Sequence, residues 1–405
     1  MNAVQFNATV PKYLSSLMLG KLNKNFYFGS LACTKYGETK EPRLPDQKWV
    51  KIKTTYSGIC GSDLNVIFLK DSPSTSPFVS FPFVFGHEVV GEITETGIYV
   101  DNFEVGDRVV VNPLLSCIQR NIARPCQNCM DGNYSLCENF TKGSLSPGIS
   151  TGFCKDTGGG WGESFVAHKS QLFKVPDNVT DEQVVFTDPL ASALHPVMKN
   201  RPKDDEKILI IGMGVIGLLM VAALRVLGSK CNITVLARYD FQGEIAKQYG
   251  ADQVIYTKDD YYSKFRDISG GFLYQPIIGK RFMIRGFDKV FDCVASDSTL
   301  DTAMKFTNAG GTMIVVGLAS VPKKVDWTPV WFKEINIRGS FYYNLVENGE
   351  GKISSFKKAF YLIVENKIDI SPLLTHTFQL KDYKKAIETA SDKSKYQSVK
   401  VLFKF

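Results

Sequence analysis

The sequence predicts an α/β protein in which a mostly β domain is joined to a domain built on a doubly wound parallel sheet. At 405 residues the chain exceeds the length at which one hydrophobic core usually stops growing, so two domains are expected. Short β-rich segments dominate up to about residue 185, and strands alternate with helices from about residue 188 onward. The composition, 44% hydrophobic and 22% charged, is typical of a globular protein.

The first part of the chain has the pattern of a compact β domain. Apolar and polar residues alternate in WVKIKTTYSGI, FVFGHEVVGEITETG and DRVVVNP, and glycine and proline separate these segments. Residues 1–48 contain one expected strand and no motif that indicates a function. The glycine-rich loop at 143–163 either forms one wall of a cleft or is a plain surface excursion.

The second part alternates helices and strands, as a parallel sheet with right-handed crossovers requires. The predicted strands include KILIIG, NITVLA, DQVIY, DKVFDCVA and GTMIVVGLA, and helices such as VIGLLMVAALRVLG and FQGEIAKQYG lie between them. Residues 269–288 are irregular and are expected to form a surface insertion. Two helices, SSFKKAFYLIVENK and DYKKAIETASDK, and the strands HTFQL and SVKVLFKF complete the chain.

Charge and targeting signals exclude several classes of function. The net charge of +7 is modest, and the basic residues are interspersed with acidic ones, so we expect no nucleic-acid partner. The N-terminus lacks the features of a secretory signal, which favours a cytoplasmic protein. Residues 208–224 carry no charge, but this stretch is shorter than the roughly 20 residues of a spanning helix, and three glycines interrupt it. No membrane partner is therefore expected.

The sequence GMGVIG lies between an apolar strand and an apolar helix. Gly212 permits a tight turn, Gly214 lets the backbone approach a pyrophosphate, and Gly217 allows close packing of the helix. Val215 and Ile216 open that helix, whose N-terminus would face the anion. The pattern predicts a dinucleotide-binding turn. The alternative is that the glycines serve only the change from strand to helix.

The residues after the second strand of this domain predict which cofactor is used. An NAD site usually has an acidic residue here to hold the ribose hydroxyls, but this chain has Ala237 followed by Arg238 and Tyr239. Arg238 is suited to pair with a 2′-phosphate. Asp240 would contact the ribose only if the turn were shifted, and it is otherwise a solvated loop residue. NADP is therefore preferred over NAD in this interpretation.

Four cysteines crowd into one polar loop. Cys126, Cys129 and Cys137 have the spacing Cys-x2-Cys-x7-Cys, and Cys117 precedes them by nine positions. Four thiolates are the number that a closed tetrahedral zinc site takes. The loop is hydrophilic, so unrelated core cysteines are a poor alternative. The sequence predicts a structural zinc site between residues 117 and 137.

A second set of residues has the composition of a catalytic zinc site, which needs three protein ligands and an open position. Cys60 in GICGSD and His87 in GHE adjoin glycines that can present a side chain, and Asp188 lies where the second domain begins. Glu88 would lie behind the metal or join it transiently. The residues alone leave another interpretation open, namely a core cysteine, a core histidine and a helix-capping aspartate.

The order of the motifs GICGSD, GHEVVGE, Cys-x2-Cys-x7-Cys, DPLASALHP and GMGVIG resembles that of the zinc-dependent medium-chain dehydrogenase/reductase superfamily, which includes alcohol and polyol dehydrogenases. The resemblance extends from about Trp49 to the C-terminus. It implies a GroES-like catalytic domain, residues 1–189 and 345–405, interrupted by a Rossmann domain, residues 190–344. It also implies a homodimer or homotetramer and two zinc ions per chain.

Carried over position by position, Cys60 and His87 match the first two catalytic zinc ligands. Asp188 matches the acidic third ligand of the polyol-dehydrogenase branch. Two departures stand out: the third ligand is more often Glu or Cys, and the first two cysteines of the structural site are usually separated by two residues. Here eight residues separate them, so Cys117 is the least secure ligand.

The resemblance also implies the reaction, which is hydride transfer between an alcohol carbon and nicotinamide. Ser62 matches the hydroxyl that passes the substrate proton outward, and Asp63 and Glu88 match the acids beside the metal. His168 and His195 are interpreted as structural or surface residues. The alternatives are a zinc-free enoyl or quinone reductase of the same superfamily, which would lack the zinc ligands, and a non-catalytic NADP-binding zinc protein.

Overall fold

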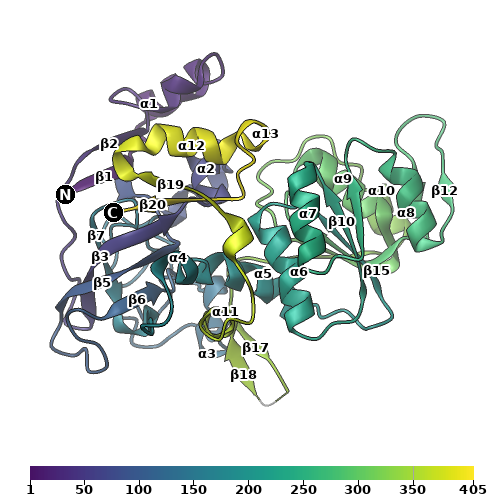
Figure 1. The fold of residues 1–405 in the computed structure, drawn as a ribbon. Coiled ribbons are helices and arrows are strands. Elements are labelled where there is room, and N and C mark those ends of the chain that lie inside the picture. Colours follow the sequence, from purple (N-terminus) through teal and green to yellow (C-terminus); the bar gives the residue numbers. More distant parts are fainter. Residues whose placement is uncertain (350) are drawn as a thin grey trace. The chain divides into compact units, whose positions relative to one another are not determined.

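The chain folds into two units, one formed by Met1–Asp188 together with Phe356–Phe405 and the other by Pro189–Ser355 (Figure 1). The computed structural model describes residues 1–349 and 351–405, so position 350, within the predicted return segment 345–405, lies outside the described residues. The first unit is thus discontinuous in sequence, and its last 50 residues join a sheet begun by residues near position 50.

The central sheet of the first unit has seven strands in the order β19-β20-β3-β5-β6-β8, with β7 also paired to β3. Its strands are β3 (Trp49–Gly58), β5 (Val89–Thr96), β6 (Arg108–Val111), β7 (Ser164–His168), β8 (Leu172–Lys174), β19 (Leu374–Gln379) and β20 (Lys400–Lys404). The C-terminal strand β20 runs antiparallel to β3, with Leu402 opposite Gly58. This pairing brings the end of the chain next to residues 55–59.

Residues 1–48 form more structure than the sequence analysis predicted. A three-stranded sheet in the order β2-β1-β4 is made by β1 (Asn2–Phe6), β2 (Thr34–Glu38) and β4 (Phe83–Val84). Between β1 and β2 lie the helix α1 (Val10–Leu19) and the 3-10 helix η1 (Lys24–Tyr27). Pro11 in the first turn of α1 starts this helix favourably, because proline lacks only an N–H that would be unpaired there.

Short helices fill the remainder of the first unit, and α12 packs against β19 and β20. They are α2 (Gly61–Ile67), η2 (Pro73–Phe78), α3 (Gln127–Met130), η3 (Tyr134–Leu136), η4 (Lys169–Gln171), α4 (Asp181–Val184), α11 (Ser355–Val364), η5 (Ser371–Leu373), η6 (Leu380–Asp382), α12 (Tyr383–Ser391) and α13 (Lys393–Tyr396). Both helices predicted in the C-terminal region are confirmed.

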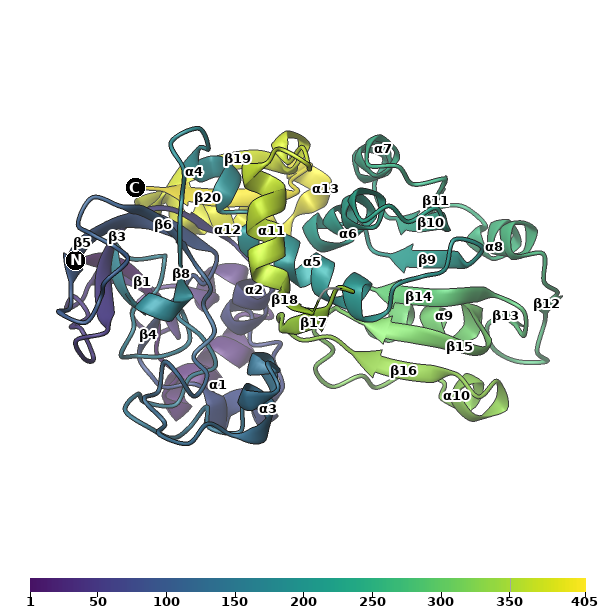
Figure 2. The ribbon, with the colours of Figure 1, turned by 90° about the horizontal axis from the view of Figure 1, so that it is seen from below.

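The second unit contains a six-stranded parallel sheet in the order β11-β10-β9-β14-β15-β16, as the sequence predicted (Figure 2). Its strands are β9 (Lys207–Ile211), β10 (Asn232–Ala237), β11 (Gln253–Tyr256), β14 (Phe287–Asp292), β15 (Thr307–Val315) and β16 (Asn336–Gly339). Strands β9, β10 and β11 follow one another toward one edge of the sheet. The chain then crosses back, and β14, β15 and β16 follow one another from β9 toward the other edge, which is the doubly wound arrangement. Strand β9 is central and fully buried beyond its first residue.

Six helices connect or flank these strands: α5 (Thr187–Lys199), α6 (Val215–Val226), α7 (Asp240–Gln248), α8 (Tyr261–Ser269), α9 (Asp297–Phe306) and α10 (Thr328–Phe332). Two small hairpins project, one of β12 (Leu273–Tyr274) with β13 (Phe282–Met283) and one of β17 (Leu345–Glu347) with β18 (Lys352–Ser354). The first hairpin is the predicted insertion, and Ile277 and Ile278 at its tip are exposed. No helix among the described residues has the length and apolar character needed to cross a membrane.

Candidate functional site

Two turns of the first unit present the predicted catalytic residues. Cys60 caps the N-terminus of α2 directly after β3, and its backbone N–H donates a hydrogen bond to Asp63 Oδ2 at 2.9 Å. His87 lies between β4 and β5. Gly86 before it has φ of +96°, and a Cβ at this position would lie 2.5 Å from the Trp161 ring. The turn that presents His87 therefore requires glycine.

The structure brings Cys60, His87 and Glu88 into one group. One ligand atom from each, a sulfur, a ring nitrogen and a carboxylate oxygen, lies within 4.8 Å of the other two. His87 and Glu88 are buried, whereas Cys60 is partly accessible. A catalytic zinc site uses sulfur, nitrogen and oxygen donors and keeps one position accessible to substrate. Cys60, His87 and Glu88 offer these donors, and the group is accessible at Cys60, so these residues fit the metal that the sequence predicts.

Neighbouring groups hold the His87 ring in place. Asp63 is completely buried, and its Oδ1 lies 3.6 Å from His87 Nδ1. A carboxylate beside one ring nitrogen favours the ring orientation that leaves the other nitrogen available to a metal. Phe153, from the loop 143–163, packs against the His87 ring at a centroid distance of 5.6 Å. This loop therefore contributes to the surroundings of the group.

Asp188, the predicted third ligand, is not part of this group. It is buried in the first turn of α5, but Glu88 takes the third place among the ligand atoms that lie within 4.8 Å of one another. Metal binding by Asp188 remains a prediction.

Sequence reasoning missed the residue that neutralises Glu88. The Lys400 ammonium forms an ion pair with Glu88 Oε2 and donates a hydrogen bond to the Ile59 carbonyl at 3.1 Å. Gly58 leaves room for the carboxylate, since a Cβ there would lie 1.9 Å from Glu88 Oε2. Lys393 is close enough to Lys400 to be affected by its charge. Burial lowers the pKa of Lys393, and the positive charge of Lys400 lowers that pKa further. Lys400 lies in the apolar strand at the end of the chain and belongs to no motif, so no feature of the sequence indicated that it pairs with Glu88.

Ser62, the predicted proton-relay residue, occupies the second position of α2. Its Oγ is buried and forms no hydrogen bond within the part of the chain that the structure describes. Burying a hydroxyl without a partner costs free energy, so such an atom is expected to meet a partner when substrate is bound. This observation fits a hydroxyl that contacts an alcohol substrate.

All four cysteines of the predicted structural site come together. Cys117 Sγ lies 3.7 Å from Cys126 Sγ and 3.6 Å from Cys137 Sγ, and one sulfur from each of the four is within 4.8 Å of the rest. Cys117 therefore joins the group despite the eight intervening residues. Asn139 donates hydrogen bonds to two of the sulfurs, at 3.2 and 3.3 Å. All nine cysteines are free thiols, and four sulfurs at this spacing match a closed zinc site.

Electrostatics of this loop also suit a metal. Burial disfavours the Cys126 thiolate, but the backbone N–H groups of Glu138 and Cys129 outweigh it and lower the Cys126 pKa to about 7. Burial raises the pKa of Cys137 to about 11. Several thiolates at this distance repel one another, so a divalent cation is needed to hold them all ionised.

Arg120 is a second residue that sequence reasoning missed. It is completely buried in the loop between Cys117 and Cys126, and its guanidinium donates to five backbone carbonyls at 2.6–3.1 Å. The acceptors belong to Leu115, Lys142, Leu145, Ser146 and Gly148. Arg120 thus joins both sides of the loop that carries the four sulfurs.

In the second unit, the glycine-rich turn has the geometry that the sequence predicts. Gly212 has φ of +92°, and a Cβ there would lie 2.2 Å from Val294 Cγ2. Gly214 caps the N-terminus of α6, and a Cβ on Gly217 would lie 2.1 Å from the Gly212 carbonyl oxygen. The exposed backbone N–H groups at the start of a helix bind phosphate well.

The charged residues after β10 differ in the partners that they contact. Arg238 is exposed, stacks at 5.5 Å on the Tyr239 ring, and forms no ion pair with the acidic side chains that the structure describes. Asp240 starts α7 and is held by Lys258, whose Nζ lies 2.6 Å from Asp240 Oδ1. The Asp240 carboxylate is thus paired with Lys258, whereas the Arg238 guanidinium remains available to a ligand.

The other histidines have structural surroundings. His168 is buried at the end of β7 and its Nδ1 is 2.8 Å from Ser170 Oγ, while His195 is buried in α5 and its Nδ1 is 3.1 Å from Ser355 Oγ. Burial lowers the pKa of each to about 4.

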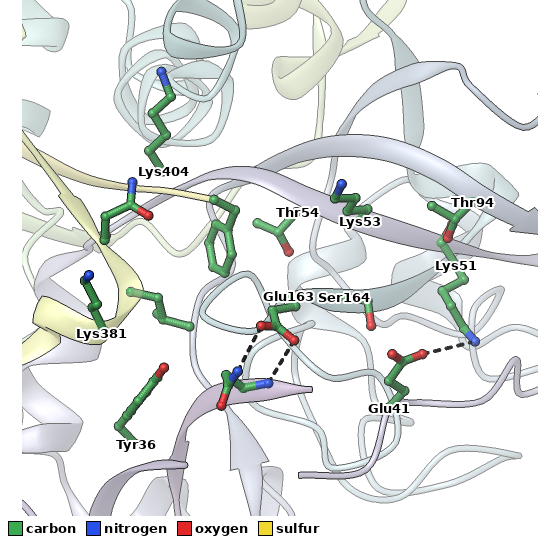
Figure 3. A pocket seen from close by; sticks show the side chains of 14 residues that line it. Tyr36, Glu41, Lys51, Lys53, Thr54, Thr94, Glu163, Ser164, Lys381 and Lys404 are labelled. Atoms are coloured by element: carbon green, nitrogen blue, oxygen red, sulfur yellow. Dashed lines mark hydrogen bonds and ion pairs between the residues drawn. The ribbon is translucent and has the colours of Figure 1, made fainter. Parts of the chain in front are cut away.

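An open pocket of about 610 Å³ on the first unit is lined by none of the predicted site residues. Lys51, which faces it, is paired with Glu41 (Figure 3).

Comparison with known proteins gives matches to both units. Residues 46–177 match the family described as "Alcohol dehydrogenase GroES-like domain", and residues 215–364 match "Zinc-binding dehydrogenase". L-idonate 5-dehydrogenase of Vitis vinifera is 31% identical over 364 residues, which is 87% of each chain. Sorbitol dehydrogenase of Arabidopsis thaliana is 29% identical over 87% of this chain and 88% of its own.

The fold is also found among solved structures. The crystal structure of 2R,3R-butanediol dehydrogenase from Bacillus subtilis superimposes with a TM-score of 0.71 at 24% identity, covering 100% of this chain and 99% of that one. The similarity of the fold thus includes residues 1–45, which neither family description matches.

Proposed function

Since this chain belongs to the zinc-dependent medium-chain alcohol and polyol dehydrogenase superfamily, and is an NAD(P)-dependent oxidoreductase of alcohols, we propose that it oxidises a secondary hydroxyl of a polyol or sugar-derived substrate with NADP as acceptor. The observation that carries the proposal is the group of Cys60, His87 and Glu88. The relatives named for idonate and sorbitol support the substrate class, because both compounds carry secondary hydroxyls beside other hydroxyls.

The residues of the site would divide the reaction among them. Zinc, when bound, supplies the Lewis acidity that lowers the pKa of a substrate hydroxyl, and NADP accepts the hydride. Cys60 and His87 hold the metal, and Asp63 keeps the His87 ring oriented. Ser62 Oγ, buried and without a partner among the described residues, receives the hydroxyl proton and passes it toward solvent.

For the third ligand we propose Asp188, with Glu88 as the acid beside the metal. The ion pair with Lys400 competes with metal binding by Glu88, which supports this division. Asp188 is buried in the first turn of α5, in the same unit as Cys60, and its position in DPLASALHP matches the acidic third ligand of the polyol-dehydrogenase branch. If Glu88 is the resident ligand instead, removal of its carboxylate will cost the chain its catalytic zinc.

The preference for NADP rests on the surroundings of Arg238. Its guanidinium is exposed and forms no ion pair among the described residues, and Asp240 is occupied by Lys258. A guanidinium that forms no ion pair among the described residues favours the 2′-phosphate, and a carboxylate already paired with a lysine repels that phosphate less.

We propose that the chain assembles as a homodimer through the edge of the parallel sheet, with a homotetramer as the alternative. β16 is the outermost strand, and all four of its residues are exposed. Trp327, just before α10, and Trp331, within it, are also exposed. Unpaired strand edges flanked by aromatic residues favour pairing with a second copy.

Nine free thiols, four of them in the structural site, agree with a reducing compartment such as the cytoplasm.

The test combines metal analysis with turnover. Purified protein is assayed for zinc by mass spectrometry and for reduction of NADP and NAD with sorbitol, idonate, 2,3-butanediol and a primary alcohol. We expect two zinc ions per chain and oxidation of the secondary alcohols with NADP. Protein that retains only the structural zinc and still oxidises these alcohols would contradict the proposal.

A further inference from the structure

The segment from Val10 to Leu31 exposes an unusual amount of apolar surface. Seven large apolar side chains in these 22 positions are each 40–82% exposed. They are Val10, Leu14, Met18, Leu19, Leu22, Phe26 and Leu31, and we call them the N-terminal apolar face. Single exposed apolar residues are ordinary, but a group of this size in one short segment marks an interaction site.

The segment is held firmly against the rest of the first unit. Tyr27 is buried and its ring contacts Phe68 edge to face at 5.2 Å. Gly20 lies against Tyr27 so closely that a Cβ would be 2.4 Å from the ring. Ser15 Oγ, on α1, donates to the Leu31 carbonyl at 3.3 Å, which ties the end of the segment to the helix. The N-terminal apolar face is therefore carried by an ordered platform.

One side of the helix provides the centre of this face. Val10, Leu14 and Met18 follow one another at intervals of four residues, so they form a stripe along α1. Ser16, on another side of the helix, is buried. Figure 1 shows α1 at the margin of the first unit; η1 packs against the helix, and the three side chains of the stripe are 51–74% exposed. The stripe therefore points away from the unit's own core.

Charge decides which partner this face fits. The first 37 residues contain four lysines, Lys12, Lys21, Lys24 and Lys35, and no aspartate or glutamate. If a second copy docked by the same face, the lysines of both copies would come together with no acidic residue of the segment between them. An apolar face whose segment carries only positive charges is instead complementary to an apolar layer that is covered by negatively charged groups.

We propose that the N-terminal apolar face docks the protein on the surface of a lipid bilayer that contains anionic headgroups. The apolar side chains enter the boundary between headgroups and acyl chains, and Lys21 and Lys24 contact the lipid phosphates. The sequence alone favoured no membrane partner, because its one long uncharged stretch is too short to span a bilayer; it does not show which apolar side chains of residues 10–31 are exposed. The proposal does not depend on the proposed function, since none of these residues belongs to the predicted catalytic or cofactor sites.

Vesicle flotation tests this proposal. Purified full-length protein is mixed with vesicles of phosphatidylcholine, alone or with 30% phosphatidylserine, at low and high salt. We expect the protein to float with the anionic vesicles at low salt, and about tenfold less with the neutral ones. The triple variant Leu14→Ser, Met18→Ser, Leu22→Ser and the variant Lys21→Glu, Lys24→Glu should both lose binding and keep full dehydrogenase activity in the absence of lipid.

The control variant removes as much exposed apolar surface elsewhere. Phe272→Ser, Ile277→Ser, Ile278→Ser changes three exposed residues of the second unit and should float like the wild type. Absence of binding to anionic vesicles, or equal binding by wild type and the Leu14 triple variant, overturns the proposal. Light scattering provides a further check: if the triple variant splits an oligomer that the wild type forms, a second copy covers the face and the proposal is wrong.

Discussion

Lys400 and Glu88 form an ion pair although they are 312 positions apart in the chain, and their side chains are only 1% and 2% exposed. The pair links the C-terminal strand β20 to the turn that presents His87. A buried carboxylate needs a cation, so the C-terminal strand is part of what makes the turn stable. It adds to the pairing of β20 with β3, which joins the end of the chain to the sheet of the first unit.

Replacement of Lys400 by methionine should destabilise the protein. The change leaves the Glu88 carboxylate buried without its partner, which typically costs about 3–5 kcal/mol. Urea unfolding of the zinc-loaded protein measures the loss. The double variant Lys400→Met, Glu88→Gln should recover much of it. Equal stability of wild type and Lys400→Met would show that Glu88 has another partner.

His87→Ala should remove the catalytic zinc and lower turnover by roughly a thousandfold or more, because the Lewis acid supplies several kcal/mol of stabilisation. Binding of the cofactor, followed by NADPH fluorescence, should change little, since the glycine-rich turn lies in the other unit. Zinc content should fall from two ions per chain to one. His376→Ala, in β19, is the matched control. Full turnover by His87→Ala would reject the assignment of this residue.

The identity of the third ligand can be settled by a pair of variants. Asp188→Asn should lose the catalytic zinc, whereas Glu88→Gln should retain it and bind it with altered affinity. The reason is that Lys400 already engages the Glu88 carboxylate. Zinc retained per chain after dialysis against a chelator is the measurement. The opposite result would make Glu88 the resident ligand, as its place in the group allows.

Arg120→Met should disrupt the structural zinc site without touching a zinc ligand. Five carbonyls lose their donor, and three of these hydrogen bonds are buried; because each unpaired buried group costs about 1–3 kcal/mol, we expect a loss of at least about 3 kcal/mol in the free energy of unfolding. Zinc should fall by one ion per chain.

Arg120→Lys is the informative control for this variant. Lysine keeps the charge but cannot reach five carbonyls, so it should behave like methionine if geometry is what matters. Retention of both zinc ions and of stability by Arg120→Met would show that the loop holds its shape without the guanidinium.

Arg238→Ala should weaken NADP binding by about 10–100-fold and leave NAD binding nearly unchanged. A charge-assisted hydrogen bond to the 2′-phosphate is worth about 1.5–3 kcal/mol, and NAD lacks this group. Fluorescence titration with both reduced cofactors measures the ratio. Asp240→Asn is the control, since Lys258 already engages that carboxylate. An equal loss for the two cofactors would contradict the preference for NADP.

Much of the fold follows from local patterns. GMGVIG predicted a turn whose Gly212 has positive φ, and the structure has it. The alternation of strands and helices predicted the parallel sheet. Such patterns are readable because they encode backbone conformation over a few residues. For residues 1–48 the sequence predicted only one strand, whereas the structure has β1, β2 and the helix α1, whose apolar stripe is exposed and does not face a core.

The sequence by itself determined the two-part architecture and predicted the glycine-rich turn and all four clustered cysteines, with Cys117 as the least secure, because each depends on residues that are close along the chain. Only the tertiary structure decided that Cys117 joins the others, that Arg120 ties their loop together, and that Lys400 meets Glu88. These contacts join residues through packing of distant segments. Their free energies depend on what is buried together, and the order of residues along the chain does not record it.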